Sequence, residues 1–173
     1  MKKILVICAF IGLLNGCSQS TITPDRYSII DNVSSLSYNA PYNIKVDMNA
    51  TLDEGGVVIK TSDVTFRSAS NHRWSSDLKE QISLIFKDFY TKYQIRKDLV
   101  SNIYINKFYG SQNGMVYIDL SVTVKLKNNS YYEKQFVFDE VQSENGYPSL
   151  VEKLKEGIYQ IAQETAQELS LKE

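Results

Sequence analysis

The sequence MVYIDLSVTVKL, residues 115–126, decides the fold class because its side chains alternate between apolar and polar. One face of this predicted strand is wholly aliphatic and carries Val116, Ile118, Leu120, Val122, Val124 and Leu126. The opposite face carries tyrosine, aspartate, serine, threonine and lysine. This alternation is typical of a strand in an antiparallel sheet that is covered on one side and solvated on the other.

Turn signals on both sides extend this strand into a predicted antiparallel meander. Gln112-Asn113-Gly114 precedes it, and Asn-Gly between alternating runs is the strongest short hairpin signal. This turn joins the strand to a β-prone run at 103–109. Asn128-Asn129 follows the strand and leads into the run 131–141, which has its two phenylalanines on one face. We therefore expect three consecutive strands with short connections.

Two amphipathic helices complete the predicted core. The first begins near Ser76 or Asp77, either of which can cap a helix. The last runs from about Pro148 to Leu169, and Gly157 inside it costs about 1 kcal/mol relative to alanine. Gly157 therefore indicates either a close approach to the sheet or a kink. The apolar stripes consist of Leu78, Ile82, Ile85, Phe86, Phe89 and Tyr93 in the first helix, and of Leu150, Val151, Leu154, Ile158, Ile161, Ala162, Thr165 and Leu169 in the last.

The N-terminal half of the domain reads as short strands joined by loops. Residues 53–56 (DEGG) are a strong turn signal, and 70–74, which contains His72, reads as a loop before the first helix. The predicted β segments are 26–30, 42–52, 57–60 and 64–68, and 32–41 is a predicted loop. The order of elements predicts an α+β fold, a mostly antiparallel sheet with two main helices packed on one face.

The first seventeen residues are typical of a secretory signal peptide followed by a lipid-anchored cysteine. A basic start, Met1-Lys2-Lys3, precedes an eleven-residue apolar run at 4–14, which is too short to span a bilayer comfortably. This is typical of a signal peptide. Leu14-Asn15-Gly16-Cys17 resembles a bacterial lipobox, which predicts cleavage before Cys17 and lipidation of its sulfur. The alternative is a buried or snorkelling cysteine beside an uncleaved hydrophobic helix.

Cleavage at this point divides the chain into three predicted parts. Residues 1–16 are the lipoprotein signal peptide, 17–25 are a lipidated tether, and 26–173 are a single α+β domain. Ser18 follows the cysteine in place of the aspartate associated with inner-membrane retention. We therefore expect the protein at the outer membrane, lipid-anchored and facing the periplasm.

Composition excludes several classes of function. The chain has 19 basic and 20 acidic residues, and removal of Lys2 and Lys3 with the signal peptide leaves 17 basic residues. Such a balance disfavours nucleic-acid binding. Two cysteines and one histidine exclude zinc fingers, disulfide frameworks and iron–sulfur sites. Since Cys8 leaves with the signal peptide and Cys17 carries lipid, no free thiol is expected. We predict no catalytic residue, no cofactor and no metal site.

Two features keep an alternative open at this point. His72 is a candidate general base, but it reads better as an exposed loop histidine. The twelve tyrosines, among them Tyr104, Tyr109, Tyr117, Tyr131 and Tyr132, indicate either ordinary strand propensity or a protein interface. A hydrolase built on carboxylates is a further hypothesis, and it requires a close pair of acids with raised pKa values in a concave pocket.

Several stretches, in order, resemble the ABC-type transport auxiliary lipoproteins, the group that includes the outer-membrane lipoprotein encoded with the paraquat-inducible transport proteins. Besides the lipobox and Ile161-Ala162-Gln163-Glu164 in the last helix, they are 26–29 (RYSI), 56–64 (GVVIKTSDV), 73–78 (RWSSDL) and 141–147 (VQSENGY). The sequence departs from the family pattern at Asn15, at Asp77, where a proline is common, and in its tyrosine-rich second half.

The resemblance implies a role without catalysis. It implies a lipoprotein of an intermembrane lipid-transport system, with a periplasm-spanning tunnel protein of the MCE (mammalian cell entry) type and its inner-membrane partner as partners. The resemblance also implies that the domain docks or gates the tunnel and supports envelope integrity. It further implies a possible homo-oligomer. The rival hypothesis is a lipoprotein that supports envelope assembly or architecture without transporting lipid.

Overall fold

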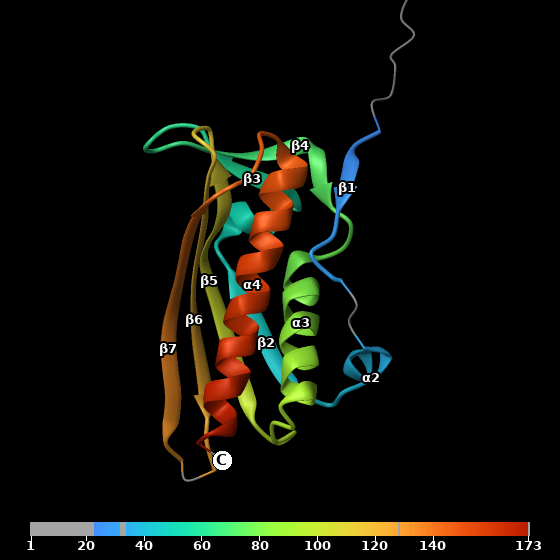
Figure 1. The fold of residues 1–173 in the computed structure, drawn as a ribbon, viewed down its shortest axis with the longest axis vertical. Coiled ribbons are helices and arrows are strands. Elements are labelled where there is room, and N and C mark those ends of the chain that lie inside the picture. Colours follow the sequence, from blue (N-terminus) through green and yellow to red (C-terminus); the bar gives the residue numbers. More distant parts are fainter. Residues whose placement is uncertain (1–22, 32–33, 128, 173) are drawn as a thin grey trace, which may run out of the picture.

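A computed structural model describes residues 23–31, 34–127 and 129–172 and confirms the α+β class. One seven-stranded sheet carries two long helices on one face (Figure 1). The elements are β1 (Asp25–Tyr27), α2 (Ser35–Tyr38), β2 (Asn43–Met48), the 3₁₀ helix η2 (Ala50–Glu54), β3 (Gly56–Lys60), β4 (Phe66–Trp74), α3 (Leu78–Lys92), β5 (Val100–Ser111), β6 (Met115–Lys125), β7 (Tyr131–Val141) and α4 (Tyr147–Ser170).

The strands β5, β6 and β7 form the predicted antiparallel meander. The register pairs Leu120 of the central strand with Ile105 on one side and with Phe136 on the other. Gly114 closes the first turn with a φ of 81°, a conformation that favours glycine. The alternation in β6 is borne out, because Val116, Ile118, Leu120, Val122 and Val124 are all buried.

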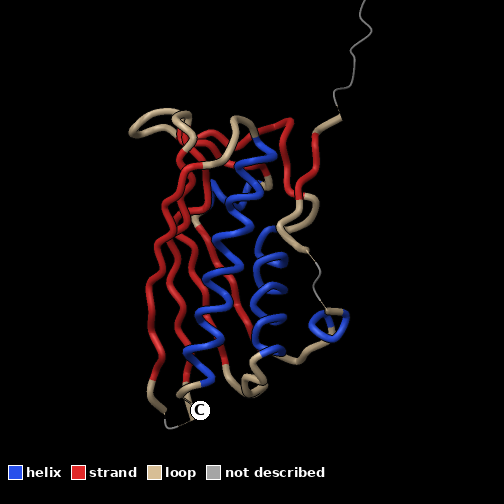
Figure 2. The backbone as a smooth tube through the Cα atoms, in the orientation of Figure 1, coloured by secondary structure: helices blue, strands red, loops and turns tan. Residues whose placement is uncertain are grey.

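Both long helices lie on the same side of this meander, as Figures 1 and 2 show. The predicted start of α3 is confirmed, because the Asp77 carboxylate accepts the backbone N–H groups of Lys79 and Glu80. In α4, Gly157 marks a close approach to the sheet. A Cβ atom at Gly157 would lie 2.6 Å from Cδ1 of Ile118 and 2.8 Å from Cδ1 of Phe138.

Parallel pairings, which the sequence did not predict, organise the other half of the sheet. β2 pairs in parallel with residues 100–105 of β5, and β3 pairs in parallel with Gly110 and Ser111 of the same strand. β2 and β3 therefore follow one another along one edge of β5, with η2 between them. β1 pairs in parallel with the end of β4. Local patterns carry no signal for such pairings, because the partners are far apart in the sequence.

Four predicted segments need correction. The predicted β segment 42–52 ends at Met48, because residues 50–54 form η2, and the predicted β segment 26–30 ends at Tyr27. Residues 35–38, inside the predicted loop 32–41, form the short helix α2. β4 extends to Trp74, beyond the predicted end at residue 68, so His72 lies in a strand and the loop interpretation is wrong. The residues from Ser68 to Arg73 have weak strand propensity, and β4 forms because β3 and β1 pair with its two edges.

Candidate functional site at the tether-side end

The chain enters the fold at one end of its long axis. Thr23 and Pro24, the first described residues of the predicted tether, lead into β1 at the upper end in Figure 1. The turn between β3 and β4 (61–65), the turn between β5 and β6 and the loop before α4 (142–146) lie at the same end. We call this the tether-side end. Cys17 and the predicted signal peptide lie outside the described residues.

The family-matching stretches 26–29, 56–64, 73–78 and 141–147 gather in this part of the molecule. Arg73 is paired with Arg26 of β1 on one side and with Gly56 of β3 on the other. Backbone hydrogen bonds continue the junction, from Ser75 N–H to the Tyr27 carbonyl (2.7 Å) and from Trp74 N–H to the Gly55 carbonyl (3.0 Å). Segments that are separate in sequence thus form one structural unit.

His72 joins the last of these stretches to the unit. Its Nδ1 lies 3.3 Å from Oδ2 of Asp25 and 3.2 Å from the hydroxyl of Tyr27. Its ring stacks on Tyr147 at the start of α4, with 3.8 Å between centroids and 17° between planes. His72 of β4 therefore contacts both β1 and α4. These partners include no serine or threonine hydroxyl, so this geometry lends no support to a nucleophile–base pair.

Two arginines lie side by side at the same junction. Arg26 and Arg73 occupy directly paired positions of β1 and β4. Nη1 of Arg26 donates to the Trp74 carbonyl at 3.4 Å, and Nη2 of Arg73 donates to the Glu54 carbonyl at 3.0 Å. Within the described part of the chain, neither guanidinium forms an ion pair. Like charges in paired positions are destabilising unless something neutralises them.

A glycine makes room for one of these guanidinium groups. Gly55 has a φ of 80° in the turn before β3, and a Cβ atom there would lie 2.8 Å from Nη2 of Arg73. The predicted turn at 53–56 therefore leads into β3 and also leaves space for Arg73 to reach the Glu54 carbonyl.

A cleft of about 210 Å³ lies beside the pair, and we call it the arginine cleft. Ser75 and Ser76 line it together with the two arginines, and Leu52, Trp74 and Leu78 are its buried apolar residues. Its two carboxylates are already engaged. Asp53 binds Nζ of Lys79 at 2.7 Å, a hydrogen bond that raises the pKa of this lysine, and Asp77 caps α3.

A longer groove of about 560 Å³ follows α3 away from this cleft, and we call it the α3 groove. The groove and the arginine cleft share Ser76. Between α3 on one side and α2 and β2 on the other, its apolar lining comes from Ile30, Tyr38, Ile44, Val46 and Leu84. Lys79, Glu80 and Lys87 add charge to its lining.

Asp88 holds α2 in place as one wall of the α3 groove. Its buried carboxylate accepts hydrogen bonds from Ser34 N–H (3.1 Å) and the Ser37 hydroxyl (2.9 Å), and Nζ of Lys92 lies 2.5 Å away. Burial by itself would raise the pKa of Asp88, but these hydrogen bonds and the Lys92 charge outweigh burial and hold the pKa below its ordinary value.

The predicted tyrosine cluster divides into two groups. Tyr109 and Tyr132 are core residues with 8% and 5% of their surface exposed. Tyr104 and Tyr131, by contrast, are 43% and 58% exposed, and Val137 on β7 is 61% exposed. Strand packing therefore explains part of the tyrosine content, and the rest contributes to exposed surface.

Two observations concern the metal and hydrolase alternatives. In residues 23–31, 34–127 and 129–172, no group of three or more His, Cys, Asp or Glu side chains is placed to hold a metal ion. The carboxyl groups of Asp98 and Glu168 have lowered pKa values, because Arg96 and Lys134 donate hydrogen bonds to them. These shifts run opposite to the raised pKa values that the hydrolase hypothesis requires. Within the same residues, no helix has the length and apolarity needed to cross a membrane.

The sequence indicates no functional residue at this junction apart from the candidate His72. Its motifs do not single out Arg26, Arg73 or the residues of the α3 groove. One signal was present, because an arginine followed by an aromatic residue occurs at both positions, in Arg26-Tyr27 and Arg73-Trp74. Only the parallel pairing of β1 with β4 brings the two dipeptides together.

Comparisons with known proteins identify the fold. No family model matches the chain, and no curated protein matches it. Among solved structures, the crystal structure of an uncharacterized protein covers 84% of this chain and 98% of its own, with a TM-score of 0.69 and 21% identity. A Xanthomonas campestris protein of family DUF330 covers 71% of this chain and 78% of its own, with a TM-score of 0.62 and 11% identity. At these identities the likeness concerns the fold alone.

Proposed function

We propose that this protein is an outer-membrane lipoprotein of an intermembrane lipid-transport system of the MCE type. In this proposal the lipid on Cys17 anchors the domain, and the domain docks or gates a periplasm-spanning tunnel protein that connects to an inner-membrane partner. Loss of the protein then weakens the envelope. No step in this role needs a catalytic residue or a cofactor.

The observation that carries the proposal is the convergence at the tether-side end. Four stretches that resemble the auxiliary lipoproteins meet around Arg73 and His72, and the predicted tether enters the fold beside them. Surface features gathered where the anchor begins are expected of a domain that works at the membrane. A purely structural domain has no need for this coincidence.

The length of the tether favours the same orientation. Asp25, the first residue of β1, is the eighth residue after Cys17. Eight residues span at most about 28 Å when extended, and about 15 Å as a flexible coil. In a lipidated protein the tether-side end therefore faces the membrane, and the opposite end points into the periplasm.

A pair of cysteine variants tests the anchor. Cys17→Ala removes the predicted lipidation site, and Cys8→Ala is the matched control within the apolar run of the signal peptide. We expect Cys17→Ala to lose the acylated N-terminus in mass spectrometry and to reproduce the bile-salt sensitivity of a deletion, whereas Cys8→Ala behaves as wild type. Unchanged bile-salt resistance in Cys17→Ala, in a strain where deletion has a phenotype, would contradict a need for anchoring.

Crosslinking in cells tests the partner. The anchored protein is crosslinked, purified and analysed by mass spectrometry for proteins and lipids together. Recovery of an MCE-type tunnel protein supports the proposal. Its absence, from cells that make the tunnel and a folded, lipidated domain, rejects it.

The alternative is a lipoprotein that supports envelope architecture without transporting lipid. The exposed side chains of Tyr104, Tyr131 and Val137 favour it, since amphipathic aromatic residues are enriched in protein interfaces. In that case the same crosslinking experiment recovers an envelope protein, but neither an MCE-type protein nor a bound phospholipid.

A further inference from the structure

We infer that the tether-side end binds one phospholipid, with its phosphate between Arg26 and Arg73 and an acyl chain along the α3 groove. This inference rests on the proposed function and deepens it, because it names the molecule that the domain holds. Four observations carry it: the pairing of the arginines, the engaged carboxylates beside them, the shared boundary of cleft and groove, and the distance to the anchor.

The arginine pair offers an anion two adjacent positive charges. The two guanidinium groups occupy paired strand positions, and neither forms an ion pair within the described residues. Each donates one hydrogen bond to a backbone carbonyl, which leaves most of its five N–H groups for another acceptor. A phosphate diester accepts paired hydrogen bonds from guanidinium groups and neutralises adjacent positive charges.

The cleft beside the pair favours a phosphate over a cation. Asp53 and Asp77 are the carboxylates that line it, and each already has a partner, because Lys79 pairs with Asp53 and two α3 backbone amides donate to Oδ1 of Asp77. Ser75 and Ser76 line the same space, and serine hydroxyl groups are donors of the kind that phosphate oxygens accept.

The α3 groove has the position and the length for an acyl chain. It shares the lining residue Ser76 with the arginine cleft, and α3 residues as far as Lys87 line it. The ten helical residues from Leu78 to Lys87 span about 15 Å, about half of the roughly 30 Å hydrocarbon core that two opposed acyl chains fill. The half-buried side chains of Ile44 and Val46 line the groove, and covering them with an acyl chain removes apolar surface from water.

The location identifies the source of the phosphate. Arg26 lies nine residues after Cys17, so the arginine cleft of a lipidated protein lies within reach of the headgroup layer. Multivalent nucleic acid is a poor match, because the mature chain is predicted to carry a net negative charge. A membrane phospholipid supplies both the phosphate and the apolar chain that the adjoining surfaces accept.

A binding experiment on the mature lipoprotein tests the inference. The protein is purified from membranes in a non-ionic detergent, titrated with phosphatidylglycerol bearing short acyl chains, and analysed by native mass spectrometry. We expect one bound lipid. The double variant Arg26→Gln/Arg73→Gln should weaken binding at least about 10-fold, because charge-assisted hydrogen bonds are lost. Arg67→Gln, at another exposed arginine of β4, is the matched control and should bind as wild type.

Two further arms separate the headgroup from the chain. Glycerophosphoglycerol, the headgroup without chains, and inorganic phosphate should each bind wild type at least about 10-fold more weakly than the short-chain lipid, because they leave the groove empty. Ile44→Gln, in the groove wall, should weaken binding of the lipid and leave binding of glycerophosphoglycerol unchanged.

Three results would overturn the inference: no lipid bound to wild type, equal binding by the double arginine variant, or equal affinity for lipid and headgroup. Circular dichroism of each variant establishes that it is folded, and the single variant Arg26→Gln, at an exposed position, replaces the double variant if the latter unfolds. Since the assay contains no tunnel protein, failure here rejects the lipid site alone, and failure of the crosslinking experiment rejects tunnel docking alone.

Discussion

The β5–β7 body and the tether-side end belong to one sheet but are held together by different interactions. In the body, consecutive strands pair antiparallel and present an aliphatic face to α4, which approaches so closely that Gly157 has no room for a side chain. At the tether-side end, β1 pairs with a strand far away in sequence, and His72, Arg26 and Arg73 make the side-chain contacts. Polar contacts near the surface contribute little to stability, whereas buried aliphatic side chains contribute most of it.

This difference assigns stability mainly to the body and the proposed lipid binding to the tether-side end. The body buries a continuous aliphatic face, whereas the tether-side end carries two arginine charges that no carboxylate of the described residues pairs with. We therefore expect substitutions in the body to change stability, and substitutions of the arginine pair to change binding.

Removing a core side chain from the body should have the largest effect. Leu154 of α4 is fully buried, and Leu154→Ala should lower the free energy of unfolding by about 2–5 kcal/mol through lost burial and a residual cavity. Leu171→Ala, at a leucine that is 83% exposed just after α4, is the control and should change it by less than about 0.5 kcal/mol. Urea denaturation measures both, and similar losses in the two variants would contradict the assignment of the core.

Removing the charge that anchors α2 should have the next largest effect. Asp88→Asn keeps the shape of the side chain but sets an amide against the donors of Ser34, Ser37 and Lys92. We expect a loss of about 1–3 kcal/mol and faster hydrogen exchange at the α2 amides. Asp98→Asn, which disrupts the exposed pair with Arg96, should leave both readouts unchanged.

Lowering the pH should reduce the free energy of unfolding of the wild type as Asp88→Asn does. Because the pKa of Asp88 is lowered in the folded state, its stabilisation is fully present above the ordinary value of 3.8 and is lost as the pH falls through the folded-state pKa. In urea titrations at decreasing pH, the difference in stability between wild type and Asp88→Asn should therefore shrink below pH 3.8. A difference that stays constant or grows there would contradict the hydrogen-bonded carboxylate.

Adding a side chain where α4 meets the sheet should have a smaller effect on stability. Gly157→Ala gains about 1 kcal/mol of helix propensity but inserts a methyl group against Ile118 and Phe138, and overpacking costs about 1–3 kcal/mol. A net loss of up to about 2 kcal/mol is expected in thermal unfolding. Gln160→Ala, an exposed position in the same helix, should not destabilise, and stabilisation by Gly157→Ala would show that the helix is not pressed against the sheet.

Neutralising one arginine should have the smallest effect on stability. Arg73→Gln removes a partly exposed charge that lies opposite another positive charge, so the free energy of unfolding should change by less than about 0.5 kcal/mol. The same variant should bind short-chain phosphatidylglycerol more weakly. A large loss of stability would show that Arg73 is a structural residue and would remove the contrast between the two regions.

The sequence predicted the body well because local rules determine it. Alternation in 115–126, an Asn-Gly turn and two helical stripes are each visible within a short window, and the structure confirms them. Even the close approach at Gly157 was one of two stated alternatives.

The tether-side end was predicted less well because long-range pairing determines it. The extension of β4 to Trp74 depends on β1 and β3, which flank it, and not on the propensity of Ser70-Asn71-His72. Arg26 and Arg73 are 47 positions apart in the sequence, and no local pattern indicates that they are neighbours. The lipid anchor at Cys17 rests on the sequence motif, since the described residues begin at Thr23.

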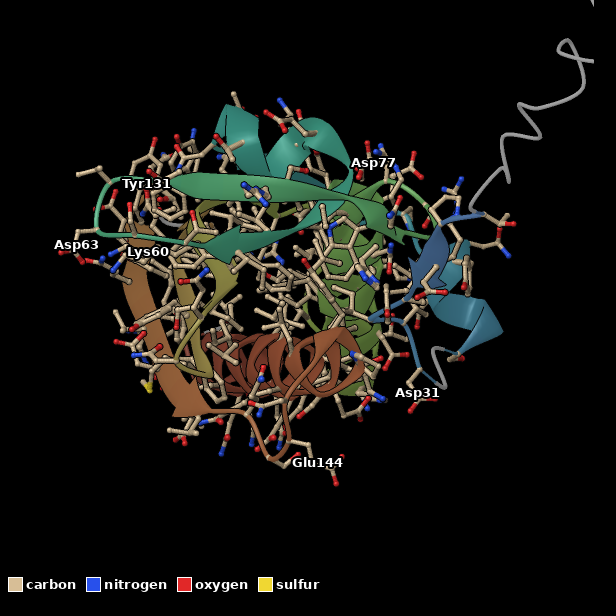
Figure 3. All side chains as sticks on the ribbon, turned by 90° about the horizontal axis from the view of Figure 1, so that it is seen from above. Asp31, Lys60, Asp63, Asp77, Tyr131 and Glu144 are labelled. Atoms are coloured by element: carbon tan, nitrogen blue, oxygen red, sulfur yellow. The ribbon has the colours of Figure 1, made fainter. Side chains whose placement is uncertain are left out.

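The two ends of the molecule give the most direct test of the central claim, that the tether-side end works at the membrane. Figure 3 looks onto this end and shows Asp63 at the tip of the β3–β4 turn, on the rim of the molecule. Lys127, in the turn between β6 and β7, lies at the opposite end. A photoreactive amino acid is placed at either position of the full chain in cells, and the crosslinked products are analysed by mass spectrometry. We predict that the probe at Asp63 captures phospholipid and the probe at Lys127 does not. Capture of phospholipid from Lys127 alone, or equally from both positions, would contradict the account.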